Sequence, residues 1–226
     1  MQKMGGLAAV IAAATFLVGF ALYFTVLSAA RYGSLDVDPA EHVKFLAAHR
    51  GLLYLWNLII YVLFGGVLVV LAVALHERLK TGAAALMQTA TAFGLIWAGL
   101  VIASGMVANI GAGVVIRLLA KDPALAASVW LSLSFIVNGL GGGNEIVGGL
   151  WLMLVSLAAL RTGGLPKALN YLGVVVSVGG LVTVVPALTE VGAVFGMGSI
   201  VWFIWAGIVM IRTTTVADIA RPAARN

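Results

Sequence analysis

Residues 51–75 read GLLYLWNLIIYVLFGGVLVVLAVAL, an apolar run without a charged side chain that is closed by the polar segment 76–80, HERLK. A helix that crosses a bilayer needs about 20 apolar residues, because each residue adds about 1.5 Å and the hydrocarbon core is about 30 Å thick. The run is long enough to cross a membrane, and we expect a transmembrane helix here.

The rest of the chain has the same apolar character. Of its 226 residues, 62% are hydrophobic and 9% are charged, whereas a soluble domain carries about 25% charged residues. So few charges cannot cover a water-facing surface, and lipid must cover most of it. We predict an all-α fold, an integral membrane helical bundle of about six transmembrane helices that forms a single domain over residues 1–226. The expected spans are 4–30, 51–75, 83–108, 135–160, 167–188 and 191–211.

The region 123–160 allows two interpretations. As one straight helix it would be about 57 Å long at about 1.5 Å per residue, much longer than the hydrocarbon core. Three consecutive glycines, 141–143, lie in its middle. Either one span covers 135–160 after an outer apolar segment, or the glycines turn the chain between two short spans, which gives seven. We favour six, because a glycine turn would leave almost no polar loop.

Aspartate–proline pairs predict where two helices begin. In Asp38-Pro39 and Asp122-Pro123, the aspartate caps free backbone N–H groups and proline suits the first helical position. A short surface helix should therefore run from Pro39 towards Arg50.

Charge and cysteine content bear on location and partners. The net charge is +5, with 13 Lys and Arg residues spread along the chain rather than gathered into a patch. This distribution indicates membrane topology, and we expect no nucleic-acid partner. We place both termini and the loop 76–82 on the inner side of the cytoplasmic (inner) membrane. The chain has no cysteines, which excludes disulfides and thiolate metal sites.

Two late stretches carry a family resemblance. Residues 141–145 with 148–151 (GGGNE and GGLW) and residues 164–173 (GLPKALNYLG) resemble segments of a bacterial family of polytopic membrane proteins of unknown function. In that family a Leu-Pro-basic-x-Leu-Gly-Tyr type motif opens a late helix, and this chain has Asn170 where a glycine often stands. The resemblance implies about six helices and a bacterial origin, and it carries no activity.

Polar residues inside the apolar runs are the candidates for function. Arg50, Tyr54, Asn57 and Tyr61 follow the spacing i, i+4, i+7, i+11 and share one face of a helix. An ionisable residue within a span is costly to keep there, so Glu145 is a functional candidate by default. If 134–156 is one helix, Ser134, Asn138, Glu145, Gly149 and Ser156 share a face.

Depth estimates place the polar face of Asn57 and Tyr61 at the same level in the membrane as Glu145. At about 1.5 Å per residue, Glu145 lies roughly 24 Å from Arg161, while Tyr61 and Asn57 lie roughly 22 and 28 Å from His76. Arg50 is then near the outer surface, where we expect an ion pair with Glu190. The prediction is an outward-opening polar pocket that binds a ligand through Glu145, Asn144, Asn138, Asn57, Tyr61, Tyr54, Arg50 and Glu190. The alternative is that these side chains only join helices by hydrogen bonds, which contribute roughly 0.6–2 kcal/mol each.

No cofactor or metal is expected. His49 and His76 lie about 40 Å apart on one helix, so they cannot hold a haem between two helices. The lysines lie at helix ends or in loops, which excludes a retinal Schiff base. His42 and His49 are interpreted as exposed, solvated side chains rather than a metal site. Trp151 and Trp202 are expected at the level of the lipid headgroups.

The function that these patterns favour is non-enzymatic. We expect a multi-pass membrane protein that binds or passes a small or lipid-like molecule near Glu145. Two alternatives stay open: a structural or accessory subunit of a membrane complex, and a membrane enzyme that uses Glu145 as acid or base. The enzyme is the weaker alternative, because only Tyr61, Asn57 and Asn144 lie at the right depth to assist. The expected partners are the lipid bilayer, a small-molecule or lipid ligand, and either a second copy or another subunit.

Overall fold

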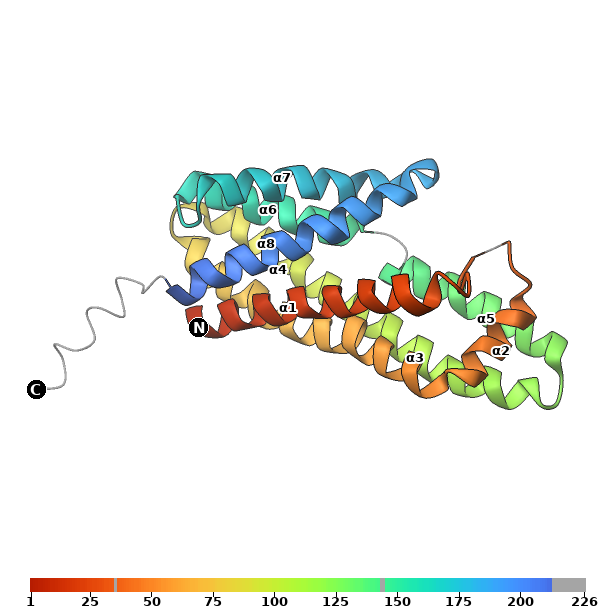
Figure 1. Cartoon of the computed structure of the whole chain (residues 1–226). Coiled ribbons are helices and arrows are strands. Elements are labelled where there is room, and N and C mark those ends of the chain that lie inside the picture. Colours follow the sequence, from red (N-terminus) through yellow and green to blue (C-terminus); the bar gives the residue numbers. More distant parts are fainter. Residues whose placement is uncertain (35, 143–144, 213–226) are drawn as a thin grey trace, which may run out of the picture. The chain divides into compact units, whose positions relative to one another are not determined.

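Helices make up every regular element in the part of the chain that the structure describes, residues 1–34, 36–142 and 145–212 (Figure 1). In this computed structural model, five segments are long and apolar enough to cross a membrane: Gln2–Leu27, Arg50–Leu119, Pro123–Thr162, Lys167–Val184 and Ala187–Arg212. The predicted all-α membrane bundle is confirmed.

The longest apolar segment folds back on itself. It comprises α3 (Arg50–Asn57), a π-helical stretch (Leu58–Leu63) and α4 (Phe64–Leu119). Within α4 the backbone leaves helical geometry at Thr81–Ala83, where Gly82 has a φ of 95°. Side chains with a Cβ rarely adopt this φ, so the glycine allows the turn. One segment therefore supplies two helical arms. Whether the chain crosses the membrane six or seven times stays a prediction.

Both aspartate–proline pairs begin helices, as predicted. Before α2 (Pro39–Ala48), Asp38 accepts a hydrogen bond of 2.9 Å from the N–H of Ala40. Before α5 (Pro123–Val137), Asp122 accepts one of 3.0 Å from the N–H of Leu125. These bonds satisfy backbone donors that the first helical turn leaves free.

The region 123–162 is two helices rather than one. After α5 a short π-helical stretch, Asn138–Gly142, contains Gly141 with a φ of 137°, and α6 (Ile146–Thr162) begins beyond it. A helix cannot continue through that φ. The favoured single span over 135–160 is therefore interrupted, and the one helix over 134–156 on which a common polar face depended does not form. Asn138 precedes the break and Glu145 follows it.

The last described part of the chain consists of three consecutive helices. Here α6 is followed by α7 (Lys167–Leu181), two short 3-10 turns (Val182–Val184 and Pro186–Val191) and α8 (Gly192–Arg212). A left-handed Gly163, with a φ of 68°, ends α6. The predicted spans 167–188 and 191–211 correspond to α7 with its 3-10 turns and to α8.

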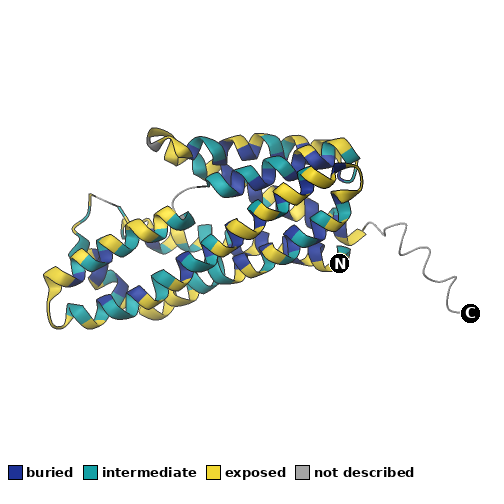
Figure 2. Ribbon diagram, turned by 180° about the vertical axis from the view of Figure 1, so that it is seen from behind, coloured by how far each residue is buried: buried dark blue, intermediate teal, exposed yellow. Residues whose placement is uncertain are grey.

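The helices form two compact units. Among the described residues, the first comprises 1–14, 67–96 and 145–212, and the second comprises 15–34, 36–66 and 97–142. Whether the two units act as the predicted single domain stays a prediction. Large apolar side chains such as Phe24, Ile110 and Val175 are exposed, and exposed positions run along many of the helices (Figure 2). Lipid would cover such surfaces.

Small residues hold the first unit together. In it α6 packs against α7 and α7 against α8. A Cβ added to Gly180 would lie 3.2 Å from the Cα of Gly149, and one added to Gly173 would lie 2.9 Å from Nε1 of Trp202. Glycine permits this close approach of the helices, as in other membrane bundles.

Two tryptophans that were expected at the level of the lipid headgroups are core residues of the bundle, while their depth in the membrane stays a prediction. Trp151 and Trp202 are 1% and 0% exposed. They pack edge to face with ring centroids 5.8 Å apart, and both contact Phe203. The glycines beside them leave room for large rings inside the bundle, so the tryptophans serve as core residues.

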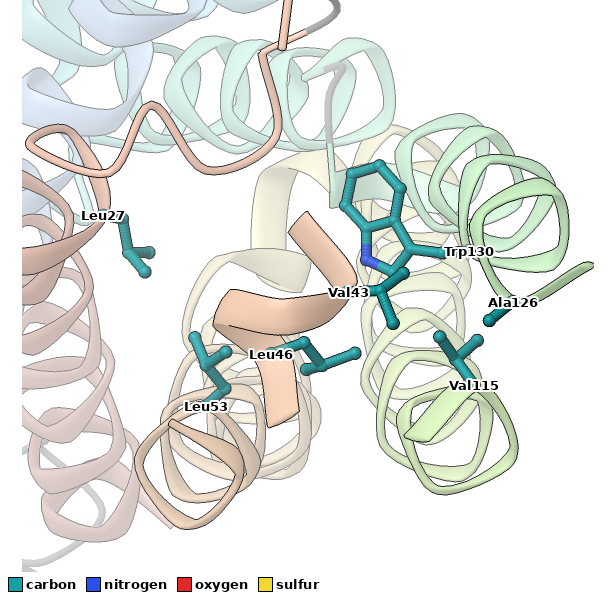
Figure 3. Packing of buried hydrophobic residues seen from close by; sticks show 7 residues of the cluster. All are labelled: Leu27, Val43, Leu46, Leu53, Val115, Ala126 and Trp130. Atoms are coloured by element: carbon teal, nitrogen blue, oxygen red, sulfur yellow. The ribbon is translucent and has the colours of Figure 1, made fainter. Parts of the chain in front are cut away.

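The second unit has its own apolar core, built around α2. The core consists of Leu27, Val43, Leu46, Leu53, Val115, Ala126 and Trp130 (Figure 3). Val43 and Leu46 come from α2, which packs against α5. The predicted short helix thus exists, with one face buried in this core rather than lying wholly on the surface.

His42 belongs to that core, contrary to the expectation that it is exposed. Its side chain is 2% exposed and stacks on Trp130 with ring centroids 4.6 Å apart. Its Nδ1 lies 3.4 Å from the donor N–H of Gly33, and its Nε2 lies 2.9 Å from the carbonyl oxygen of Ser34. In this arrangement Nδ1 accepts from the Gly33 N–H and Nε2 donates to the Ser34 carbonyl. His49 is half-buried and stacks on Phe45.

Alkaline pH should destabilise the core of the second unit. Burial beside Phe45 and Trp130 raises the pKa of the Tyr32 hydroxyl above its ordinary value of about 10. Because the folded-state pKa is the higher one, the stabilisation is complete below about pH 10 and is lost as the pH rises through the folded pKa. We expect the apparent melting temperature in detergent to fall above about pH 10. Tyr32→Phe should flatten this fall, and Tyr171→Phe, at an exposed position of α7, should not. An unchanged pH profile in Tyr32→Phe would contradict this assignment.

Candidate functional site

A cavity of about 370 Å³ opens in the second unit beside the predicted polar stripe. Its polar lining residues are Arg50, Tyr54, Asn57, Asn109 and Arg117. Its apolar lining residues are Leu46, Leu53, Ala112, Gly113 and Ile116. Three members of the predicted site, Arg50, Tyr54 and Asn57, are thus brought to one cavity.

The opposite wall comes from α4 and was missed by the sequence analysis. Asn109, Gly113 and Arg117 are spaced four residues apart, so they share one face of that helix. Asn109 and Arg117 stand out in the sequence as polar residues within an apolar stretch. The sequence does not show that they face α3, because this depends on the turn of the chain at Thr81–Ala83.

A pair of amides closes one end of the cavity. Asn57 Nδ2 donates a hydrogen bond of 3.0 Å to Oδ1 of Asn109, and Asn109 Nδ2 lies 3.3 Å from the carbonyl oxygen of Tyr54, to which it donates. These bonds join α3 to α4 and fix which residues of the two helices are opposite each other. This is the interhelical role that the alternative interpretation assigned to the stripe.

Two arginines line the same cavity. Arg50 is the first residue of α3 and Arg117 lies in the last turn of α4. A Cβ added to Gly113 would lie 3.6 Å from Nη1 of Arg117, so the guanidinium folds back along α4 beside the cavity. None of the lining residues is acidic. The cavity therefore has a positive charge.

Tyr61 continues the stripe beyond the cavity lining. A Cβ added to Gly105 would meet the Cβ of Tyr61 at 2.6 Å and the carbonyl oxygen of Asn57 at 3.3 Å. The stripe thus lies on one face, as its spacing predicted, and the structure places that face against α4 rather than against the helix of Glu145. At Tyr61 the two helices are too close to leave a cavity.

Glu145 lies in the first unit, at the N-cap position of α6. Its backbone N–H donates a hydrogen bond of 3.1 Å to Oγ1 of Thr183, which in turn donates one of 2.6 Å to the carbonyl of Gly180. Its Cγ lies 3.7 Å from where a Cβ of Gly192 would be. The start of α6, the end of α7 and the start of α8 therefore meet at this residue.

The remaining predicted site residues are not joined to this arrangement. Asn138 is exposed at the end of α5, and Asn144 lies outside the described residues. Glu190 is exposed in the first unit, whereas Arg50 belongs to the second. The ion pair between Arg50 and Glu190, and a common pocket for Glu145 with Asn57 and Tyr61, stay predictions.

Metal ligands do not gather in the described ranges. No three His, Asp or Glu side chains there lie close enough to hold an ion. The contacts described for Glu145 are with Thr183, Gly180 and Gly192, and none of these residues has a titratable group. An acid–base mechanism would need a second group at that position.

Comparison with known proteins adds no assignment. No protein-family model, curated protein or solved structure matches the chain. The resemblance to a bacterial family, the bacterial origin and the inner-membrane location therefore stay predictions. The helical structure with several membrane-length apolar segments supports the broader statement that this is a membrane protein.

The amide pair should couple the stability of α3 and α4. Asn57→Leu and Asn109→Leu should each lower the free energy of unfolding in detergent by about 0.6–2 kcal/mol. The double variant should cost less than the sum, because the first substitution already removes the shared bond. Gln88→Leu, at an exposed position of α4, is the control. Fully additive effects in denaturant unfolding would contradict the coupling.

The bond at the start of α6 should not depend on the carboxylate of Glu145. Thr183→Val removes the acceptor of the Glu145 N–H and should destabilise the protein by about 1–3 kcal/mol. Glu145→Gln keeps that backbone bond and should leave the apparent melting temperature close to that of the wild type. An equal loss in Glu145→Gln would show that the side chain itself anchors the helix.

Proposed function

We propose that this chain is a multi-pass membrane protein that binds a small or lipid-like molecule in the cavity between α3 and the C-terminal half of α4. The observation that carries the proposal is the lining of this cavity. Polar side chains of two facing helices share it with an apolar wall, which is the composition of small-molecule sites in general.

The size of the cavity supports a small ligand or one end of a larger one. Its volume of about 370 Å³ falls in the range of ligand pockets, about 300–1,000 Å³. At about 30 Å³ for each water molecule, the space corresponds to roughly a dozen waters. A headgroup with the first part of an acyl chain, or a compact soluble molecule, has this size.

Helix association alone does not account for the lining. The hydrogen bond between Asn57 and Asn109 already joins α3 to α4. The side chains of Arg50 and Arg117 add nothing to that bond, and the space beside them is not filled by protein. Their position at a cavity supports binding rather than interhelical bonding as their role.

Glu145 is not part of the proposed binding site. Binding requires only the cavity of the second unit, whereas passage of a molecule through the membrane near Glu145 stays a prediction. The contacts of Glu145 supply no second catalytic group, so no observation favours the enzyme as a second candidate.

Filling the cavity should remove the bound molecule. A Cβ at Gly113 meets only Arg117 within 4 Å, so the larger side chain of Gly113→Leu can project into the space beside it. Gly99→Leu is the matched control, because Gly99 lies on the same helix at an exposed position with nothing within 4 Å. Both proteins would be purified in mild detergent, and their small molecules extracted and quantified by mass spectrometry.

We expect a molecule that is present in stoichiometric amount in the wild type and Gly99→Leu and is lost from Gly113→Leu. The apparent melting temperatures of the two variants check that both fold. Equal retention of every co-purified molecule by the two variants would reject the cavity as the binding site.

A further inference from the structure

We infer that the molecule held in this cavity is an anionic amphiphile whose phosphate or carboxylate group is bound by Arg50 and Arg117 and whose apolar part lies against Leu53 and Ile116. The inference rests on the proposed function and names the class of ligand. It follows from the charge of the second unit, the arrangement of the cavity and the chemistry of guanidinium groups.

The acidic residues of the second unit are all engaged elsewhere. Asp36 pairs with Arg31 at 3.2 Å, and Glu41 pairs with Lys44 at 2.8 Å. Asp38 and Asp122 cap the N-termini of α2 and α5. These are the four acidic residues of that unit. The positive charge of Arg50 and Arg117 is therefore not balanced by a carboxylate of the same unit.

The arrangement of the lining separates a charged end from an apolar wall. Asn57 lies seven residues beyond Arg50, about 10 Å along the helix. The arginines thus mark one end of the cavity and the amide pair marks the other, with Tyr54 between them. Leu53 and Ile116 are among the apolar residues of the lining. A molecule with one anionic end and an apolar body matches both features.

Guanidinium groups suit phosphate and carboxylate in particular. Their planar set of donors can bind two oxygens of one oxyanion, and the resulting charge-assisted bonds are stronger than bonds between neutral groups. The sequence places Arg50 near the outer surface, which is the level at which lipid headgroups carry their charge. An amphiphile in the bilayer would present its anion at that level and its chain to the apolar wall.

A structural role explains the place of Arg117 only in part. A cation in the last turn of a helix stabilises the helix dipole, wherever its side chain points. The guanidinium of Arg117 lies beside Gly113, towards the cavity. Helical side chains lean towards the N-terminus, so this direction is the ordinary one, and it brings the guanidinium to the lining of the cavity, where an anion could reach it.

The test uses the full-length protein in micelles of the neutral detergent dodecyl maltoside. Three probes are compared: dodecyl phosphate, monolauroyl glycerol as a neutral amphiphile of the same chain length, and inorganic phosphate. Binding is measured by native mass spectrometry and by the rise in the apparent melting temperature with probe concentration. The variants are Arg50→Gln and Arg117→Gln, with Arg117→Lys as the conservative substitution and Arg161→Gln, in the last turn of α6, as the control.

We expect dodecyl phosphate to bind the wild type at least about tenfold more tightly than either other probe, the factor that about 1.4 kcal/mol produces. Each of Arg50→Gln and Arg117→Gln should weaken it by about tenfold or more. Arg117→Lys should retain part of the affinity, and Arg161→Gln should behave as the wild type. Melting temperatures without probe show whether each variant folds.

Two outcomes would overturn the inference and leave the proposed function standing. Equal affinity for monolauroyl glycerol and dodecyl phosphate, unchanged by the glutamine variants, would show that the site does not select an anion. Equal affinity for inorganic and dodecyl phosphate would show a soluble anion without an apolar part. If no probe binds and Gly113→Leu changes nothing, the proposed function fails as well.

Discussion

The hydrogen bond between Asn57 and Asn109 determines how the second unit is arranged. In an apolar surrounding, an amide that loses its partner stays unsatisfied, because lipid offers no replacement donor or acceptor. The bond therefore selects one register of α3 against α4. In that register Tyr61 packs against Gly105, and Arg50 and Arg117 line the same cavity. The cavity is thus a consequence of where one pair of amides meets.

The first unit is held together in a different way. Apolar side chains gain little by leaving lipid for a protein interior, so helices in membranes associate through close packing. Gly149, Gly173 and Gly180 allow α6, α7 and α8 to approach until backbone atoms are nearly in contact. The rings of Trp151 and Trp202 fill the space that remains. Glu145 lies where these helices begin and end, and its bonded N–H gives it a structural role there.

The polar side chains of the two units are therefore engaged to different degrees. Thr183 and Asn170 bond to backbone carbonyls within the first unit, and the aspartates of the second unit cap helices or pair with cations. Arg50 and Arg117 differ, because their charges face a cavity with no acidic residue in its lining. Both arginines are exposed at this cavity, and the proposed anion would balance their charge there.

Much of this architecture follows from the sequence alone. Apolar runs such as 51–75 exceed the length that a bilayer requires, Asp38 and Asp122 precede prolines at helix starts, and the spacing of Arg50, Tyr54 and Asn57 places them on one face. These features are local, because they depend on one helix and its period. Only the tertiary structure decided what each helix faces. Asn109 and Arg117 became the opposite wall of the cavity because Gly82 turns the chain, and the common face of Asn138 and Glu145 was lost because Gly141 interrupts the helix. The burial of His42 and Trp202 also depends on the tertiary structure. Burial depends on which side chains pack against a residue, and the period of a single helix carries no information about its neighbours.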